Sequence, residues 1–212
     1  MNYPLVSIII PYRINRGFLW KTLQTVYQQS YQGPIEIILS NHDNSVSYNI
    51  NRAIEIASGD YIKYLCDDDM LPINSIEDSV EAIKDYDFIN GNATAFFTEG
   101  VFKGQKKEYI PENKYPTFEQ LIVYNSIHGG SLMYKREVFE QVGLFNEGIN
   151  CAEEYEFNLR CLKHGLKIGY CNKNLYLYRR HGKQKSLGNG INQMERQYKI
   201  FQIRESLTNK KT

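Results

Sequence analysis

Three consecutive aspartates, Asp67, Asp68 and Asp69, lie in the segment "YLCDDDML" directly after a short apolar run. Adjacent carboxylates repel one another, and no basic residue adjoins them. Such clusters bind a hard divalent cation, act as nucleophile or general acid or base, or cap the following helix. Capping explains one carboxylate, whereas a divalent cation offsets the repulsion of all three. Because Mg²⁺ and Mn²⁺ complete their coordination with substrate phosphates, the cluster points to a phosphorylated substrate.

Strands and amphipathic helices are predicted to alternate through the first 97 residues. Apolar, β-branched runs are typical of strands buried on both faces, and we expect them at residues 5–11, 35–40, 60–66 and 87–97. Helical spacing of apolar residues predicts the intervening helices at residues 17–33, 45–59 and 73–86. Ser75 and Asp78 have the spacing of a capping box. This order predicts an α/β fold with a Rossmann-like, mostly parallel central sheet and helices on both faces.

Polar clusters follow the first three predicted strands: "PYR" at residues 11–13, "NHDNS" at 41–45 and the aspartates at 67–69. Ligands bind outside the carboxyl ends of the strands in such sheets, so we expect the fold to bring these clusters together. The sequence has neither G-x-G-x-x-G after the first strand nor G-x-x-x-x-G-K-[ST], which argues against dinucleotide and P-loop sites. A metal ion that bridges carboxylates to a diphosphate agrees with both observations.

The second half of the chain has a less regular pattern. We expect a loop or hairpin at residues 102–118, a short helix at 117–126, and a strand followed by a helix at 131–143. A further helix is expected at 152–165, two short strands at 166–181, and a helical tail at 191–207. No linker-like composition and no internal repeat is present, so we predict one domain over residues 1–212.

The composition predicts a globular protein. Apolar residues make up 42% of the chain, and 25 basic against 24 acidic residues give a net charge of +1, so charge gives no reason to expect nucleic acid as a partner. No apolar stretch approaches the roughly 20 residues of a transmembrane helix, and the N-terminus lacks signal-peptide features. The four widely spaced cysteines indicate free thiols. We expect a cytoplasmic protein and leave a peripheral position at a membrane open.

Five segments, in this order, resemble the signature of family 2 glycosyltransferases with the GT-A fold. They are "VSIIIPYR", "EIILSNHDNS", "ASGDYIKYLCDDDMLP", "VGLFNEG" with "AEEYEFNLRCLKHG", and "YRRH". The resemblance implies a single GT-A domain with a nucleotide-sugar-binding half at residues 1–100, an acceptor-side half at 101–190 and a C-terminal helix and tail at 191–212. Compact domains of this length also occur at the N-terminus of virus-encoded glycan-building enzymes.

The implied activity is transfer of a hexosyl or deoxyhexosyl unit from a nucleotide-diphospho-sugar, with UDP favoured, to an acceptor hydroxyl. The family inverts the anomeric carbon and uses Mn²⁺ or Mg²⁺. The acceptor, on a glycan, glycoprotein or glycolipid, stays open. Two alternatives also stay open. One is a sugar-phosphate nucleotidyltransferase, although "PYRIN" stands where that family has a glycine-rich loop. The other is a nucleotide-sugar-binding module without catalysis.

The resemblance also implies which residues contact the donor. Carried over by position, they are Pro11, Tyr12, Arg13, Asp43, Asn51, Asp67, Asp68, Arg180 and His181. Asp43 would accept a hydrogen bond from the base, although the family usually has two adjacent acids there. Arg180 or His181 would lie near the phosphates.

The register of the aspartates within the family motif is open. Aligned on the preceding strand, Asp68 is the metal ligand and Asp67 faces the ribose; aligned on the following proline, Asp69 is the ligand. We slightly favour Asp69 and keep all three as candidate ligands. "AEEYEF" resembles the motif whose second acid is the general base, which gives Glu154 with Glu153 beside it. The family usually has aspartate there, so a glutamate requires the helix or the acceptor to lie slightly further away.

Overall fold

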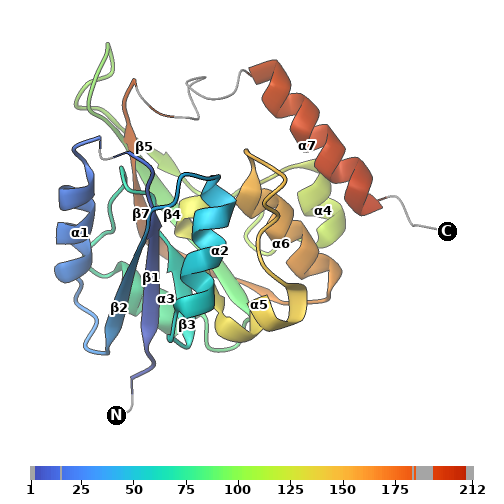
Figure 1. Cartoon of the computed structure of the whole chain (residues 1–212), viewed down its shortest axis with the longest axis horizontal. Coiled ribbons are helices and arrows are strands. Elements are labelled where there is room, and N and C mark those ends of the chain that lie inside the picture. The colour runs from blue at the N-terminus through green and yellow to red at the C-terminus, as the bar shows by residue number, and fades with distance from the viewer. Residues whose placement is uncertain (1–2, 15, 183, 185–192, 209–212) are drawn as a thin grey trace.

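A seven-stranded mixed sheet forms the centre of the molecule (Figure 1). The computed structural model describes residues 3–14, 16–182, 184 and 193–208. The strand order is β2-β1-β3-β6-β4-β5, with β7 paired to β4. The strands are β1 (Val6–Pro11), β2 (Ile35–Ser40), β3 (Tyr61–Tyr64), β4 (Phe88–Phe97), β5 (Lys106–Tyr109), β6 (Met133–Lys135) and β7 (Ile168–Arg180).

Seven helices and one 3-10 turn connect and cover the strands in the described part of the chain. They are α1 (Leu19–Tyr27), α2 (Val46–Ile56), α3 (Ser75–Ala82), α4 (Phe118–Val123), η1 (Gly129–Ser131), α5 (Arg136–Val142), α6 (Glu153–Lys163) and α7 (Gln193–Thr208). None of these helices combines the length and the apolar character that crossing a bilayer requires. The expected α/β architecture is confirmed.

Side chains of β1 alternate between two hydrophobic clusters, one on each face of the sheet. Ile8 packs in a cluster with Val26 of α1, on the face that α3 also covers. Ile9 packs in the other cluster with Ile50 of α2, and α5 and α6 complete that layer. Helices on both faces are therefore confirmed, and they explain why β1 is a continuous apolar run.

β1 pairs in parallel with both β2 and β3, so these three strands end at the same edge of the sheet. β6 is antiparallel to β3 and β4, and β5 forms an antiparallel hairpin with β4, which confirms the expected hairpin in the charged segment. The polar segments that follow β1, β2 and β3 consequently lie together.

Two local expectations were wrong. Residues 168–180 form one strand rather than two, because β7 pairs with β4 along its whole length. The polar residues 172–174 are accommodated by shifts of the pairing register on either side of Asn92 in β4. The N-cap of α3 is Asn74, which forms no side-chain cap. Ser75 is instead buried against β7, where its hydroxyl donates to the Leu175 carbonyl at 2.7 Å. Satisfying a buried carbonyl thus replaces the expected capping box.

Candidate functional site

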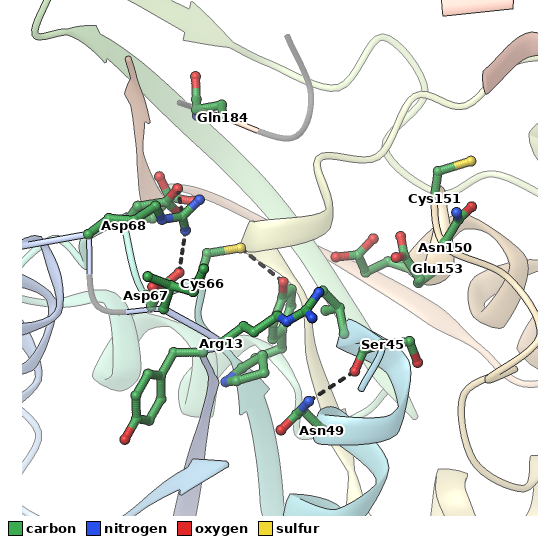
Figure 2. A pocket seen from close by; sticks show the side chains of 18 of the residues that line it. Arg13, Ser45, Asn49, Cys66, Asp67, Asp68, Asn150, Cys151, Glu153 and Gln184 are labelled. Carbon is green, nitrogen blue, oxygen red and sulfur yellow. Dashed lines mark hydrogen bonds and ion pairs between the residues drawn. The ribbon is translucent and has the colours of Figure 1, made fainter. Parts of the chain in front are cut away.

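A cavity of about 650 Å³ lies at the carboxyl ends of β1 and β3, between the N-terminal ends of α2 and α6 (Figure 2). The polar segments after β1 and β3, the start of α2 and the acidic start of α6 all line it, as expected for the crevice of such a sheet. The predicted site residues in its lining are Pro11, Tyr12, Arg13, Asp67, Asp68, Asp69, Glu153 and Glu154.

Two of the three aspartates form ion pairs with side chains from distant parts of the chain. Arg16 Nη2 lies 2.6 Å from Asp67 Oδ1 and 3.1 Å from Asp68 Oδ2. His181 Nε2 lies 3.0 Å from the same oxygen of Asp68. Burial raises the pKa of Asp67, and the Arg16 charge opposes that rise. The repulsion evident in the sequence is therefore reduced by the Arg16 charge that the fold brings to the loop.

Asp69 is the most deeply buried of the three, with 1% of its surface exposed. The hydroxyl of Tyr176 and the backbone N–H of Arg179 each donate to one of its oxygens at 2.7 Å. Burial raises the pKa of Asp69 to about 8, and the neighbouring Asp68 charge adds to the rise. Thr22 fixes the loop itself, since its hydroxyl contacts the carbonyls of Asp67 and Asp69 at 3.0 and 2.7 Å.

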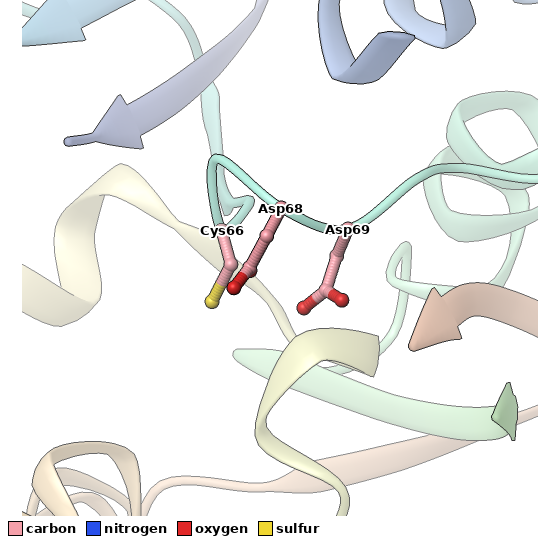
Figure 3. Close-up of side chains that lie close together, drawn as sticks. All are labelled: Cys66, Asp68 and Asp69. Atoms are coloured by element: carbon pink, nitrogen blue, oxygen red, sulfur yellow. The ribbon is translucent and has the colours of Figure 1, made fainter. Parts of the chain in front are cut away.

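The side chains of Cys66, Asp68 and Asp69 point to the same side of the loop (Figure 3). One ligand atom from each lies within 4.8 Å of the others, close enough to share one cation. Carboxylate oxygens are the ligands that Mg²⁺ and Mn²⁺ prefer, and each oxygen has two lone pairs, so Asp68 and Asp69 fit such an ion despite their hydrogen bonds. Asp67 is outside this group and pairs with Arg16.

The acidic pair Glu153 and Glu154 opens α6 on the opposite wall of the cavity. The preceding Ala152 has a φ of 58°, a left-handed conformation that costs of order 1–3 kcal/mol in a non-glycine residue, and it forms no side-chain cap. The helix N-terminus favours both carboxylates electrostatically. Glu154 packs against Gly129, where an added Cβ would lie 3.1 Å from Glu154 Cδ.

The loop at residues 41–45 is held by Asn49, which lines the cavity. The side chain of Asn49 accepts from the His42 backbone at 2.7 Å and donates to the His42 and Ser45 carbonyls at 3.1 and 3.0 Å. Asn51, which was predicted to contact the nucleotide-sugar, lies two residues further along α2 and does not line the cavity. Its side-chain amide donates to the Phe145 carbonyl and accepts from the Phe145 backbone N–H, each at 2.9 Å. On a helix, two residues of separation change the face, which explains the difference.

The remaining predicted residues are not among the described residues that line the cavity. Asp43 forms an exposed ion pair at 2.6 Å with Arg13, which does line it. Arg180 lies over the Tyr178 ring, 5.3 Å from its centroid, and donates to its hydroxyl at 3.2 Å. His181, with 2% of its surface exposed, contacts Asp68 from behind. Neither Arg180 nor His181 is among the described residues that line the cavity.

A second cavity, of about 390 Å³, adjoins the first. The two share lining residues: Tyr64, Cys66, Asp69, Ala152, Glu154, Tyr178 and Arg196. Tyr109, His128 and Tyr176 line only the second. Helix α7 contributes Arg196, Ile200 and Arg204 to its wall. Glu154 thus belongs to both cavities, whereas Glu153 lines only the first.

Sequence reasoning missed several residues of this site: Arg16, Asn49, Cys66, Tyr176, Arg179 and Arg196. For Arg16 and Cys66 a weak signal was present, because each is polar and lies within a few residues of a strand end, whereas Asn49 lies inside α2. Tyr176, Arg179 and Arg196 come from β7 and α7, whose positions opposite the aspartates are set by the tertiary fold.

A Rossmann-like sheet with a carboxylate cluster at a strand end, facing an acidic helix N-terminus across a cavity, is the arrangement that the sequence led us to expect for the GT-A fold. The model of the glycosyl transferase family 2 matches residues 39–143, and the chain belongs to this family. The resemblance stated from the sequence is confirmed.

Relatives of known sequence agree with this assignment. The chain is 25% identical over 191 residues to an uncharacterized glycosyltransferase of Rickettsia felis, covering 76% of this chain and 32% of that protein. It is 23% identical over 194 residues to one of Rickettsia typhi, covering 76% and 59%. The chain therefore spans between about a third and three fifths of the length of these two relatives.

Solved structures of TarS from S. aureus, residues 1–349, share the fold. The complex with UDP-GlcNAc aligns with a TM-score of 0.74 at 13% sequence identity and covers 98% of this chain and 66% of that one. The complex with UDP aligns with a TM-score of 0.69. At this identity the likeness is one of fold.

Proposed function

We propose that the protein transfers a hexosyl or deoxyhexosyl group from a UDP-sugar to an acceptor hydroxyl by a metal-dependent, inverting displacement. One observation carries the proposal: the Asp68–Asp69 pair and Glu154 lie on opposite walls of the same cavity. A donor diphosphate beside the aspartates would place its sugar between them and Glu154. The UDP-bound TarS structures support the choice of nucleotide.

The nucleotide would lie along the ends of β1 and β2. Pro11, Tyr12 and Arg13 would border it, and Asp43 would accept from the base. This requires the exposed Arg13–Asp43 ion pair to open, which is inexpensive because such pairs contribute little. Asn49, rather than Asn51, holds the loop that presents Asp43.

Asp68 and Asp69 are the residues that would hold Mn²⁺ or Mg²⁺. When bound, the ion supplies charge neutralisation for the departing diphosphate. Arg16 and His181 orient Asp68, and Tyr176 orients Asp69, so that both carboxylates are in place before a ligand arrives. Asp67 anchors the loop through Arg16 and faces the ribose in the proposed arrangement.

Glu154 would act as the general base. It takes the proton of the acceptor hydroxyl as that oxygen bonds to the anomeric carbon and the bond from that carbon to the diphosphate oxygen breaks, which inverts the carbon and releases UDP. Glu154 lines both cavities, which supports a role between a donor in one and an acceptor in the other. Glu153 lines only the first cavity and would face the donor.

The partners proposed are a UDP-sugar donor and a glycan, glycoprotein or glycolipid acceptor. We propose a cytoplasmic setting for this reaction, where nucleotide-sugars can reach the cavity, and leave a peripheral position at a membrane open. Residues 1–100 would supply the donor site and residues 101–190 the acceptor side, with the C-terminal helix completing the second cavity.

Calorimetric titration of UDP with and without Mn²⁺ tests the proposal. We expect binding to need the metal and to fall by two orders of magnitude or so in Asp68→Asn and Asp69→Asn, since each loses a ligand charge. Asp85→Asn is the matched control, because Asp85-Tyr86-Asp87 is a second D-x-D segment outside both cavities. Equal UDP affinity without metal and in all three variants would overturn the metal site.

A further inference from the structure

Several aromatic side chains line the second cavity. The ring of His128 lies with its centroid 5.6 Å from those of Tyr109 and Tyr176 and 5.3 Å from that of Tyr178. Tyrosine and histidine rings combine an apolar body with a polar tip. The cavity therefore offers flat apolar faces together with hydroxyl and imidazole groups.

His128 is a neutral side chain with hydrogen-bonding capacity to spare. Burial lowers its pKa to about 4. Its Nδ1 is buried and has no hydrogen-bond partner within the described residues. A neutral imidazole carries one N–H donor and one acceptor nitrogen. His128 therefore contributes a donor and an acceptor to the lining of the second cavity.

A pyranose ring matches these walls. Its C–H faces pack on aromatic rings, and its rim of hydroxyls both accepts from an imidazole N–H and donates to a carboxylate. The volume of about 390 Å³ is at the small end of ligand sites, which run from roughly 300 to 1,000 Å³. An alkyl chain would instead offer no hydrogen bond to the polar groups of Asp69, Glu154 and Arg196 that line the cavity, and would shield them from water at a cost in free energy.

We infer that the second cavity binds the acceptor as a sugar ring, with Tyr109 and His128 as residues that determine its specificity. The inference rests on the proposed function, because Glu154 would take the proton from a hydroxyl of the ring bound there. The sugar of the donor has the same chemistry. The assignment to the acceptor follows from the lining: among the described residues, Pro11–Arg13 and Asp67–Asp68 line the first cavity and not the second.

Saturation-transfer NMR on the full chain, with UDP and Mg²⁺ present, tests this inference. The probes are the methyl glycosides of glucose, galactose, N-acetylglucosamine and rhamnose, with 1-hexanol and N-acetylserine amide as stand-ins for lipid and protein acceptors. We expect saturable binding of at least one glycoside. His128→Asn and Tyr109→Ala should each weaken it about tenfold, the scale of one lost contact of about 1.4 kcal/mol.

His164→Asn and Tyr115→Ala are matched controls, since both side chains are exposed and lie outside the two cavities. Each should bind the glycoside as wild type does. Glycoside affinity unchanged in His128→Asn and Tyr109→Ala, or binding of hexanol or the serine amide in place of every glycoside, would overturn the inference.

Affinities for UDP, UDP-glucose and UDP-N-acetylglucosamine, measured by calorimetry, separate the two proposals. Unchanged values in His128→Asn, together with lost glycoside binding, support an acceptor site. A selective loss of UDP-sugar affinity relative to UDP would assign the ring to the donor and overturn the inference. If wild type binds no UDP, the proposed function fails, and the glycosides, titrated without UDP, still decide whether the cavity binds sugar.

Discussion

The two adjoining cavities differ in how the polar groups at their centres are satisfied. In the first, each of the three aspartates has a donor within 3.1 Å, supplied by Arg16, His181, Tyr176 and the Arg179 backbone. In the second, the Nδ1 atom of His128 is buried without a partner in the described structure, and the neighbouring groups are mostly aromatic rings. One region is built around a charged network fixed in advance, and the other contains a buried imidazole nitrogen that the described residues leave unpaired.

The difference follows from what each region would bind. A metal ion and a diphosphate need carboxylates at fixed positions, and outer hydrogen bonds hold them there. A neutral sugar needs flat apolar surface and a few hydrogen-bond donors and acceptors that are not already paired within the protein. Glu154 and Tyr176 connect the regions: Glu154 lines both cavities, and Tyr176 bonds to Asp69 while its ring faces His128.

Replacing Glu154 should have the largest effect. Glu154→Gln keeps the shape of the side chain but removes the base, so kcat should fall on the order of 10²- to 10⁴-fold while UDP affinity stays the same. Release of UDP from a donor and an acceptor glycoside is the measurement. Glu153→Gln is the matched control, and its kcat should change far less because Glu153 lines only the first cavity. A larger loss in Glu153→Gln would exchange the two roles.

Lys63 of β3 is a reference point for the two cavities, because it is a fully buried ionisable group that lines neither of them. Its Nζ donates to the Leu132 carbonyl at 3.3 Å, and burial lowers its pKa to about 7. As the pH falls from about 10 towards 7, the unfolded chain binds a proton that the folded chain does not. The free energy of unfolding should therefore fall by up to about 1.4 kcal/mol per pH unit and level off below about 7.

Urea unfolding at several pH values in this window, in wild type and Lys63→Met, measures the effect. The slope of the difference between the two proteins isolates Lys63, since all other titrating groups are shared. Lys103→Met, which changes an exposed lysine, should retain the wild-type slope. Parallel curves for wild type and Lys63→Met would show that Lys63 is already charged in the folded protein.

Tyr176→Phe distinguishes the role of Tyr176 in the first cavity from its role in the second. The substitution removes the donor to Asp69 but keeps the ring beside His128. We expect Mn²⁺ affinity, followed by calorimetry, to weaken about 10- to 100-fold, the usual effect of losing an outer-shell partner. Methyl glycoside binding should stay at the wild-type level. Tyr170→Phe is the control, because this hydroxyl contacts Asn92 away from both cavities. Loss of glycoside binding in Tyr176→Phe would show that one network serves both regions.

Much of the fold and part of the site were predictable from local pattern. Four buried runs and the helices between them specify the α/β sheet, because periodicity and β-branched composition act within a few residues. Parallel pairing then places whatever follows β1, β2 and β3 at one edge, which is why "PYR" and the aspartates meet in the first cavity. The continuity of β7 was not predictable, since only its pairing with β4 holds the polar residues 172–174 in a strand.

The sequence by itself determined the chemistry that gathers at the sheet edge: the three aspartates and the acidic start of α6. The tertiary structure decided how those groups are used. Arg16 reaches Asp67 across 51 residues of chain and Tyr176 reaches Asp69 across 107, and helix phase selects Asn49 over Asn51. Such partners depend on the packing of α1, α2 and β7 around the loop, and no local pattern contains that information, because contacts between distant segments exist only once the chain has folded.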